Sequence, residues 1–96
     1  MEKNKNPEEF YDKLRARLEE TSSWPSEYLF KFIVTSDEQK IKQIEKIFDN
    51  MGAVIKTTAS RTGKFTSVSI NVRMKDPDHV IKKYKEVSVV DGVISL

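Results

Sequence analysis

The groups in this sequence that could perform acid–base or nucleophilic chemistry are few. The only imidazole among the 96 residues is His79, and the chain has no Cys that it could activate as a nucleophile. A metal site of soft ligands needs thiolates or several imidazoles, which one His cannot supply. We therefore expect no catalytic residue, no metal and no cofactor, and we interpret His79 as an ordinary surface histidine.

The stretch Thr62-Gly63-Lys64 resembles part of a phosphate-binding loop, but the pattern fails on both sides. Thr58 stands where the first glycine belongs, and Phe65 stands where the magnesium-binding hydroxyl belongs. A hairpin turn is therefore the better interpretation. Arg61 and Lys64, which flank Gly63, could still hold an anion in a backbone nest, and the alternative is two solvated charges at a turn.

Small and basic side chains mark a second candidate site. Between residues 64 and 74 polar residues alternate with apolar ones, so the polar set would share one face of a strand. Lys31 lies in the predicted strand over residues 27–34, on the face that corresponds to this polar face. Combined with the hairpin, these segments predict a polar, basic binding surface made of Lys31, Arg61, Lys64, Phe65, Ser67, Ser69, Asn71 and Arg73.

This surface favours a protein or a small metabolite over nucleic acid. RNA-binding sheets of this kind stack bases on two or three aromatic side chains, whereas only Phe65 is placed to do so. The net charge of +2, from 17 Lys and Arg against 15 Asp and Glu, is far below the excess typical of nucleic-acid binding. Single-stranded RNA binding is thus kept only as the alternative function.

The hydrophobic pattern predicts the elements that position these residues. Alternation predicts strands over residues 27–34, 53–61, 64–74 and 88–96, and a spacing of three to four residues predicts helices over 7–20, 36–51 and 77–87. We expect caps from Asn6 and Asp76, each ahead of a proline, and a capping box of Ser36 and Gln39. Gly52 should end the second helix in a left-handed conformation.

This order of elements predicts a ferredoxin-like βαββαβ sandwich of the α+β class. Right-handed crossovers place two helices on one face of a four-stranded antiparallel sheet and leave the other face open. The core face should carry Tyr28, Phe30, Phe32 and Val34 on the first strand and Val68, Ile70, Val72 and Met74 on the third.

The N-terminal helix stands outside this plan. We divide the chain into residues 1–26, the N-terminal helix and linker, and residues 27–96, the ferredoxin-like domain. The apolar stripe of Phe10, Leu14 and Leu18 must be buried somewhere, and one interpretation lays this helix across the open face of the sheet.

The hairpin sequence Ala59-Ser60-Arg61-Thr62-Gly63-Lys64-Phe65-Thr66-Ser67-Val68-Ser69-Ile70 resembles the bacterial YbeD-like family. That family has a serine, a basic residue, a glycine and an aromatic residue ahead of Ser-Val-Ser-Ile. Trp24-Pro25 and Phe30-Lys31 agree with two further segments, so the resemblance covers most of residues 10–96, although the N-terminal helix is longer here and Trp24 replaces the usual Phe. The resemblance implies a domain similar to the amino-acid-sensing ACT modules, of unassigned activity and without catalytic residues.

We therefore expect a non-catalytic regulatory or adaptor domain rather than an enzyme, with a protein or a small metabolite as its partner. The polar start of the chain lacks the apolar stretch of a secretory signal or a membrane span, which predicts a cytoplasmic protein without a membrane partner.

A homodimer through the C-terminal edge strand is a further hypothesis. The last segment is rich in apolar residues that could pair with a second strand, whereas Asp91 and Gly92 would oppose such pairing. The apolar residues of this segment are Val89, Val90, Val93, Ile94 and Leu96.

Overall fold

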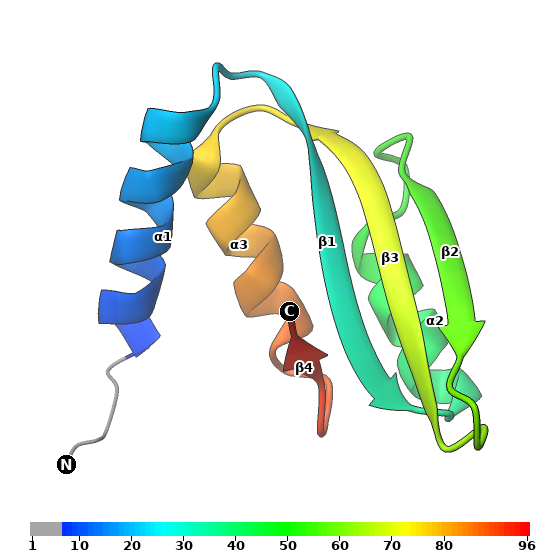
Figure 1. Ribbon diagram of the computed structural model, residues 1–96. Helices are drawn as coiled ribbons and strands as arrows, with labels where there is room; N and C mark the ends of the chain where they lie inside the picture. Colours follow the sequence, from blue (N-terminus) through cyan, green and yellow to red (C-terminus); the bar gives the residue numbers. More distant parts are fainter. Residues whose placement is uncertain (1–6) are drawn as a thin grey trace, which may run out of the picture.

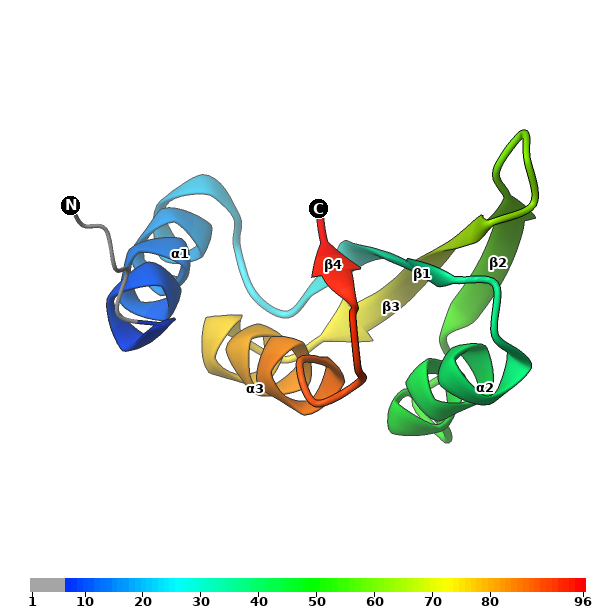
Figure 2. The same ribbon diagram turned by 90° about the horizontal axis from the view of Figure 1, so that it is seen from below.

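A computed structural model, which describes residues 7–96, shows three helices and four strands (Figure 1). They follow the order α1 (Pro7–Thr21), β1 (Ser26–Thr35), α2 (Glu38–Ile47), β2 (Val54–Ala59), β3 (Phe65–Met74), α3 (Pro77–Val87) and β4 (Ile94–Ser95). The strands form one antiparallel sheet in the order β2-β3-β1-β4. The predicted α+β, ferredoxin-like arrangement is confirmed, and α2 and α3 lie on the same face of the sheet (Figure 2).

The long central pair β1–β3 carries the core. All ten residues of β1 pair with β3, from Ser26 opposite Met74 to Thr35 opposite Phe65. Because side chains alternate between the two faces, every second residue of this pair points toward the helices. Phe30, Phe32, Val68 and Ile70 are fully buried there, as predicted.

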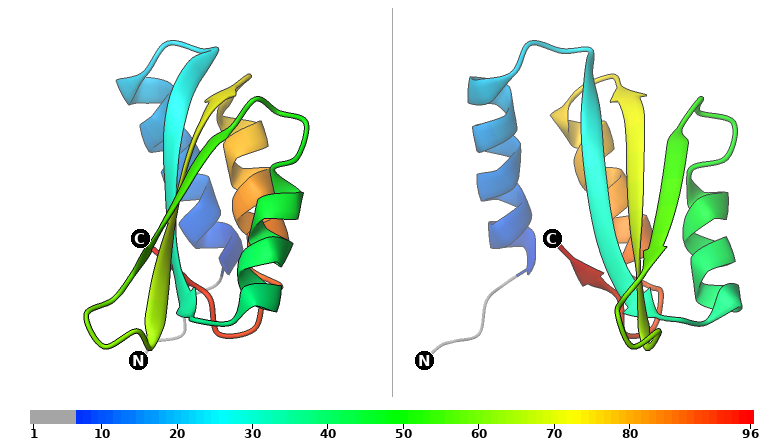
Figure 3. Two further views of the ribbon diagram at one scale, coloured as in Figure 1. Left: turned by 90° about the vertical axis from the view of Figure 1, so that its right-hand side faces the viewer. Right: turned by 45° about the vertical axis from the view of Figure 1, so that its right-hand side comes forward.

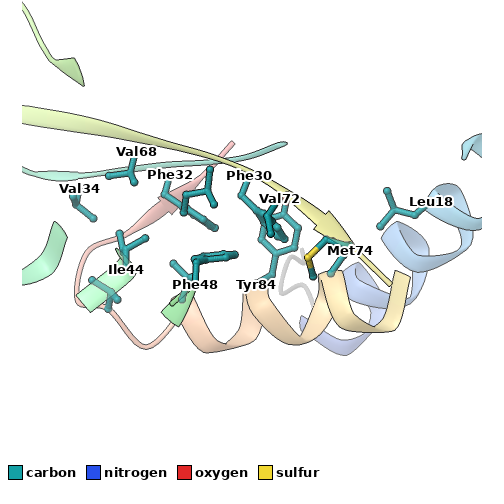
Figure 4. Packing of buried hydrophobic residues seen from close by; sticks show 14 residues of the cluster. Leu18, Phe30, Phe32, Val34, Ile44, Phe48, Val68, Val72, Met74 and Tyr84 are labelled. Atoms are coloured by element: carbon teal, nitrogen blue, oxygen red, sulfur yellow. The ribbon is translucent and has the colours of Figure 1, made fainter. Parts of the chain in front are cut away.

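Aromatic rings join the sheet to both helices (Figure 4). The ring centroid of Phe30 lies 5.0 Å from that of Phe48, just past the end of α2, and 5.1 Å from that of Tyr84 on α3. Phe32 stacks on Phe30 at 6.1 Å. Aromatic pairs in this range add to the free energy gained from burial, and a buried Phe is worth about 3–5 kcal/mol relative to Ala.

Helix α1 does not cross the open face of the sheet. Figure 2 shows it beside α3, on the side away from α2. Leu18 is buried in the core, and the indole of Trp24 donates a hydrogen bond to the carbonyl of Leu18 at 3.1 Å. Arg15 forms an ion pair with Asp78 of α3. The interpretation that laid this helix over the open face is therefore wrong, and the expected Asn6 cap lies outside the described residues.

The start of α2 differs from the predicted capping box. Asp37 is the N-cap, and its carboxylate accepts a hydrogen bond from the amide of Gln39 at 2.9 Å. Ser36 still belongs to the end of the β1–β3 pair, since its amide donates to the carbonyl of Lys64 and its hydroxyl bonds that of Thr66 at 2.8 Å. The helix also ends earlier than predicted, although Gly52 does take a left-handed conformation with φ of +71°.

The other helix start is as predicted. Asp76 caps α3 by accepting a hydrogen bond from the amide of His79 at 2.9 Å, and Pro77 occupies the first turn. The missing N–H of Pro77 costs nothing at this position, because the first amides of a helix have no intrahelical partner.

The predicted last strand is mostly not a strand. Only Ile94 and Ser95 form β4, opposite Ile33 and Phe32 of β1. Val90 explains the difference, because this side chain is buried in the core and its amide bonds the carbonyl of Val87. The chain must therefore stay close to α3 up to Val90 before it can turn back to the sheet.

The buried hydroxyl of Tyr84 generates a prediction about alkaline pH. It lies 2.8 Å from the hydroxyl of Tyr28, and burial, reinforced by this hydrogen bond, raises the pKa of Tyr84 well above its usual 10.0. The unfolded chain loses the proton near pH 10, whereas the folded chain keeps it. The contribution to stability is therefore complete below about pH 10 and is lost as the pH rises above that value.

Tyr84→Phe should flatten this decline, because Phe has no proton to lose. The free energy of unfolding, measured with urea at neutral pH and at several values above pH 10, should fall less steeply for the variant than for the wild type. At neutral pH the variant should lose about 1 kcal/mol with the hydrogen bond. Tyr11→Phe is the control, and an equally steep decline in wild type and Tyr84→Phe would contradict the assignment.

Candidate functional site

A row of two lysines and a serine crosses the centre of the open sheet face. Lys31 of β1 lies directly opposite Ser69 of β3, and Ser69 lies directly opposite Lys56 of β2. Directly opposed residues hold their Cβ atoms about 4.5–5.5 Å apart, so both ammonium groups can reach the space above the Ser69 hydroxyl. We call these three residues the lysine row.

Two shallow hollows lie at the lysine row and beside it. The first has a volume of about 220 Å³ and is lined by Leu29, Val54, Lys56, Ser69 and Asn71. The second, of about 250 Å³, lies toward the β2–β3 hairpin and is lined by Ile33, Thr58, Ala59, Ser60, Phe65 and Ser67. Leu29, Val54 and Phe65 are each about half exposed, so the hollows present apolar surface to solvent.

The electrostatics of the lysine row favour an anionic group. Neither Lys31 nor Lys56 forms an ion pair within residues 7–96. Two cations on either side of one hydroxyl can share a carboxylate or a phosphate oxygen. The arrangement offers positioned charge and hydrogen bonding, but no base beside a nucleophile.

Six of the eight predicted surface residues share the open face. Ser67, Ser69, Asn71 and Arg73 follow one another on β3, with Phe65 at the hairpin end and Lys31 on the neighbouring strand. Arg73 lies opposite Glu27 at the far end of the face. The structure therefore brings these residues together along two central strands.

Arg61 and Lys64 lie in the hairpin, beyond the end of this face. The amide of Gly63 donates to the carbonyl of Ser60 at 2.9 Å, and the amide of Phe65 donates to the Ser60 hydroxyl at 3.1 Å. The Lys64 amide is directed to the Thr62 hydroxyl at 3.4 Å. Because these amides already have partners, the hairpin offers side-chain charge rather than a backbone nest.

Sequence reasoning missed the contribution of β2 to this face. Val54, Lys56 and Thr58 lie opposite Asn71, Ser69 and Ser67, and they complete both hollows and the lysine row. As an edge strand, β2 is exposed on nearly every residue, with only Ile55 half-buried. The alternation of Val54, Lys56 and Thr58 was a signal, but Thr57 on the opposite face is exposed as well, which obscured it.

His79 plays a structural role at the start of α3. Its ring nitrogen Nδ1 lies 2.7 Å from the carboxylate of Asp76, and this bond, with that from the His79 amide, holds the pKa of Asp76 below its usual range. The two side chains cap a helix and are partly exposed. Within residues 7–96 no three His, Asp or Glu side chains gather as metal ligands would.

One protein family matches most of this fold. Residues 19–96 match a family described as protein of unknown function (DUF493). The chain belongs to the DUF493 family. The DUF493 match begins near the end of α1 and includes the whole sheet, the lysine row and both hollows.

No individual relative of this DUF493 domain was found. No curated protein and no solved structure matches the chain. Among the helices of residues 7–96, none has the length and apolar character needed to cross a membrane. The chemistry of the open face is therefore the basis for any functional proposal.

The lysine row makes a prediction that stability measurements can check. Ser69→Asp places a carboxylate between Lys31 and Lys56, whereas Ser67→Asp places one between Ile33 and Thr58. Both variants put an unfavourable Asp into a strand, but only the first gains opposite-charge cross-strand pairs.

The free energy of unfolding should therefore be higher for Ser69→Asp than for Ser67→Asp, by roughly 0.5 kcal/mol or more. Added salt should reduce this difference, because both pairs are exposed. Equal stability of the two variants at low salt would show that the lysines do not converge on Ser69.

Proposed function

We propose that this DUF493 domain is a non-catalytic adaptor or regulatory domain that binds a protein partner through its open sheet face. The observation that carries the proposal is the lysine row together with two hollows, each of which includes exposed apolar side chains in its lining. A partner surface with a carboxylate or a phosphate between two apolar side chains would match all three features.

The size of the hollows favours a protein over a small metabolite. Small-molecule sites usually enclose about 300–1,000 Å³. The hollows of the open face, at about 220 and 250 Å³, are smaller and shallow. A protein partner can use both hollows and the charges between them at once, whereas a small metabolite would leave most of the face uncovered.

The resemblance to the YbeD-like family supports a finer proposal. The hairpin motif and the Trp24-Pro25 pair favour a YbeD-like, ACT-like regulatory domain of the bacterial cytoplasm. ACT-like modules act by recognising another molecule, which agrees with an exposed polar face that offers no base and nucleophile pair. We therefore propose a role in recognition and not in catalysis.

Affinity capture from native cytosol tests the role of this face. The bait is the wild type, beside a variant in which Lys31, Lys56 and Arg73 are replaced by Ala. We expect a protein that the wild type retains at low salt and that the variant loses, because the partner's acidic groups lose the basic side chains with which they pair. Lys42→Ala with Lys46→Ala on α2 is the control, since these two exposed lysines lie on the helical side of the domain.

The outcomes separate three functions. Loss of the same protein from both variants would contradict the assignment to the open face. Retention that disappears after ribonuclease treatment would instead support the single-stranded RNA alternative. Turnover of a phosphate or acyl ester by the purified domain would contradict a non-catalytic role.

A homodimer through the C-terminal edge strand is a separate proposal. The short β4 leaves Ile94 and Leu96 more than half exposed, and an apolar edge of this kind can pair with a second copy. Light scattering over a hundredfold range of dilution should then show a mass that falls at low concentration. A monomer at every concentration would exclude this dimer.

A further inference from the structure

Strand β4 covers only one end of the outer edge of β1. Phe32 and Ile33 pair with Ser95 and Ile94, and the amide of Leu96 donates to the carbonyl of Lys31 at 3.0 Å. Within residues 7–96 no strand pairs with Ser26–Phe30 on this side. Figure 3 (right) shows this stretch of β1 continuing above β4, with α1 on the same side of β1 as β4.

The backbone of Leu29 faces this uncovered edge. In an antiparallel strand the N–H and C=O of one residue point to the same side, and successive residues alternate. Lys31 directs its carbonyl to β4, so Leu29, two residues before it, directs its amide and carbonyl to the same side, where no strand lies. An extended peptide that continues the line of β4 would find a donor and an acceptor here.

An apolar groove runs along the core side of the same edge. It is lined by Phe10, Tyr11 and Leu14 of α1, Tyr28 of β1, Tyr84 of α3, and Ser95 and Leu96. Its volume of about 180 Å³ suits side chains of an added strand better than a whole metabolite. Residues of a peptide opposite Tyr28 and Phe30 would point into it, because opposed side chains share a face.

Two basic side chains of α1 lie beside this groove. A neighbouring hollow is lined by Phe10, Leu14, Lys13 and Arg17, so Phe10 and Leu14 are shared between the two. Helical spacing puts Lys13 and Arg17 on the side of Phe10 away from the buried Leu18. Neither cation has an ion-pair partner in the described part of the chain.

We propose that the free edge of β1 between α1 and β4 binds an extended segment of a partner protein in which aliphatic and acidic residues alternate. The segment runs antiparallel to β1 and bonds the amide and carbonyl of Leu29. Its aliphatic side chains enter the groove beside Tyr28 and Leu14, and its carboxylates face Lys13 and Arg17. This edge is independent of the lysine row, so either site can exist without the other.

A short peptide of alternating Glu and Val, blocked at both ends, is the direct probe. On titration into the isotopically labelled protein, the amide of Leu29 should shift in its NMR spectrum, and its hydrogen exchange should slow as it gains a partner. A peptide of the same sequence with its Glu backbone nitrogens methylated is the matched control, because with Val opposite Tyr28 and Phe30 it is the Glu amides that face Leu29 and would form the strand ladder. We expect it not to protect Leu29.

Charge reversal on α1 tests the acidic preference. Lys13→Glu with Arg17→Glu should weaken binding of the Glu-Val peptide by roughly tenfold or more and favour a Lys-Val peptide instead. Lys42→Glu with Lys46→Glu on α2 should leave the affinity unchanged. Both pairs are exposed, so each variant is expected to fold.

Several results would overturn the proposal. These are equal binding of the methylated peptide, unchanged affinity of the Lys13 and Arg17 variant, peptide-induced shifts at Ser69 and Lys56 instead of Leu29, and no binding at millimolar peptide. Protection of the Leu29 amide in the free protein that grows with protein concentration would also overturn it, because the occupant would then be a second copy of the chain.

Discussion

The packing of two phenylalanines of β1 against both helices is the contact on which this fold depends. Phe30 touches Phe48 after α2 and Tyr84 on α3, and Phe32 extends the same cluster. Because these side chains alternate with Leu29, Lys31 and Ile33, fixing the aromatic face inward fixes the other residues outward. The position of the core thus determines the position of the open, polar face, since a slip of one residue would exchange the two.

The same constraint explains which features could be predicted from sequence. The β1 and β3 alternation is strong because one face is buried and the other is polar, so the core face and the outward row from Phe65 to Arg73 follow directly. Strand β2 lacks this contrast because it lies at an edge, and Lys56 was missed with it. The lysine row joins residues of three strands, which only the pairing register brings together.

Other differences arise where tertiary contacts override local pattern. Ser36 fits a helix cap by spacing, but its hydroxyl bonds Thr66 and leaves the cap to Asp37. The valines near the C-terminus suggest a strand, yet Val90 is needed in the core and delays the return to the sheet. The stripe of α1 suggests burial without saying where, but only Leu18 is buried and Phe10 stays 60% exposed, while the ion pair of Arg15 with Asp78 accompanies the contact with α3.

The way in which α1 is attached has a consequence for the groove that it borders. Leu18 of α1 is buried in the core, and Tyr11 and Leu14 are partly buried against it. The ion pairs of Arg15 with Asp78 and of Glu8 with Lys85 are exposed and contribute little to stability. Elements with few buried contacts open by local unfolding at much lower free energy than the central sheet. The two walls of the groove therefore differ in how they are held, since β1 pairs with β3 along its whole length whereas α1 adds few buried side chains to the core.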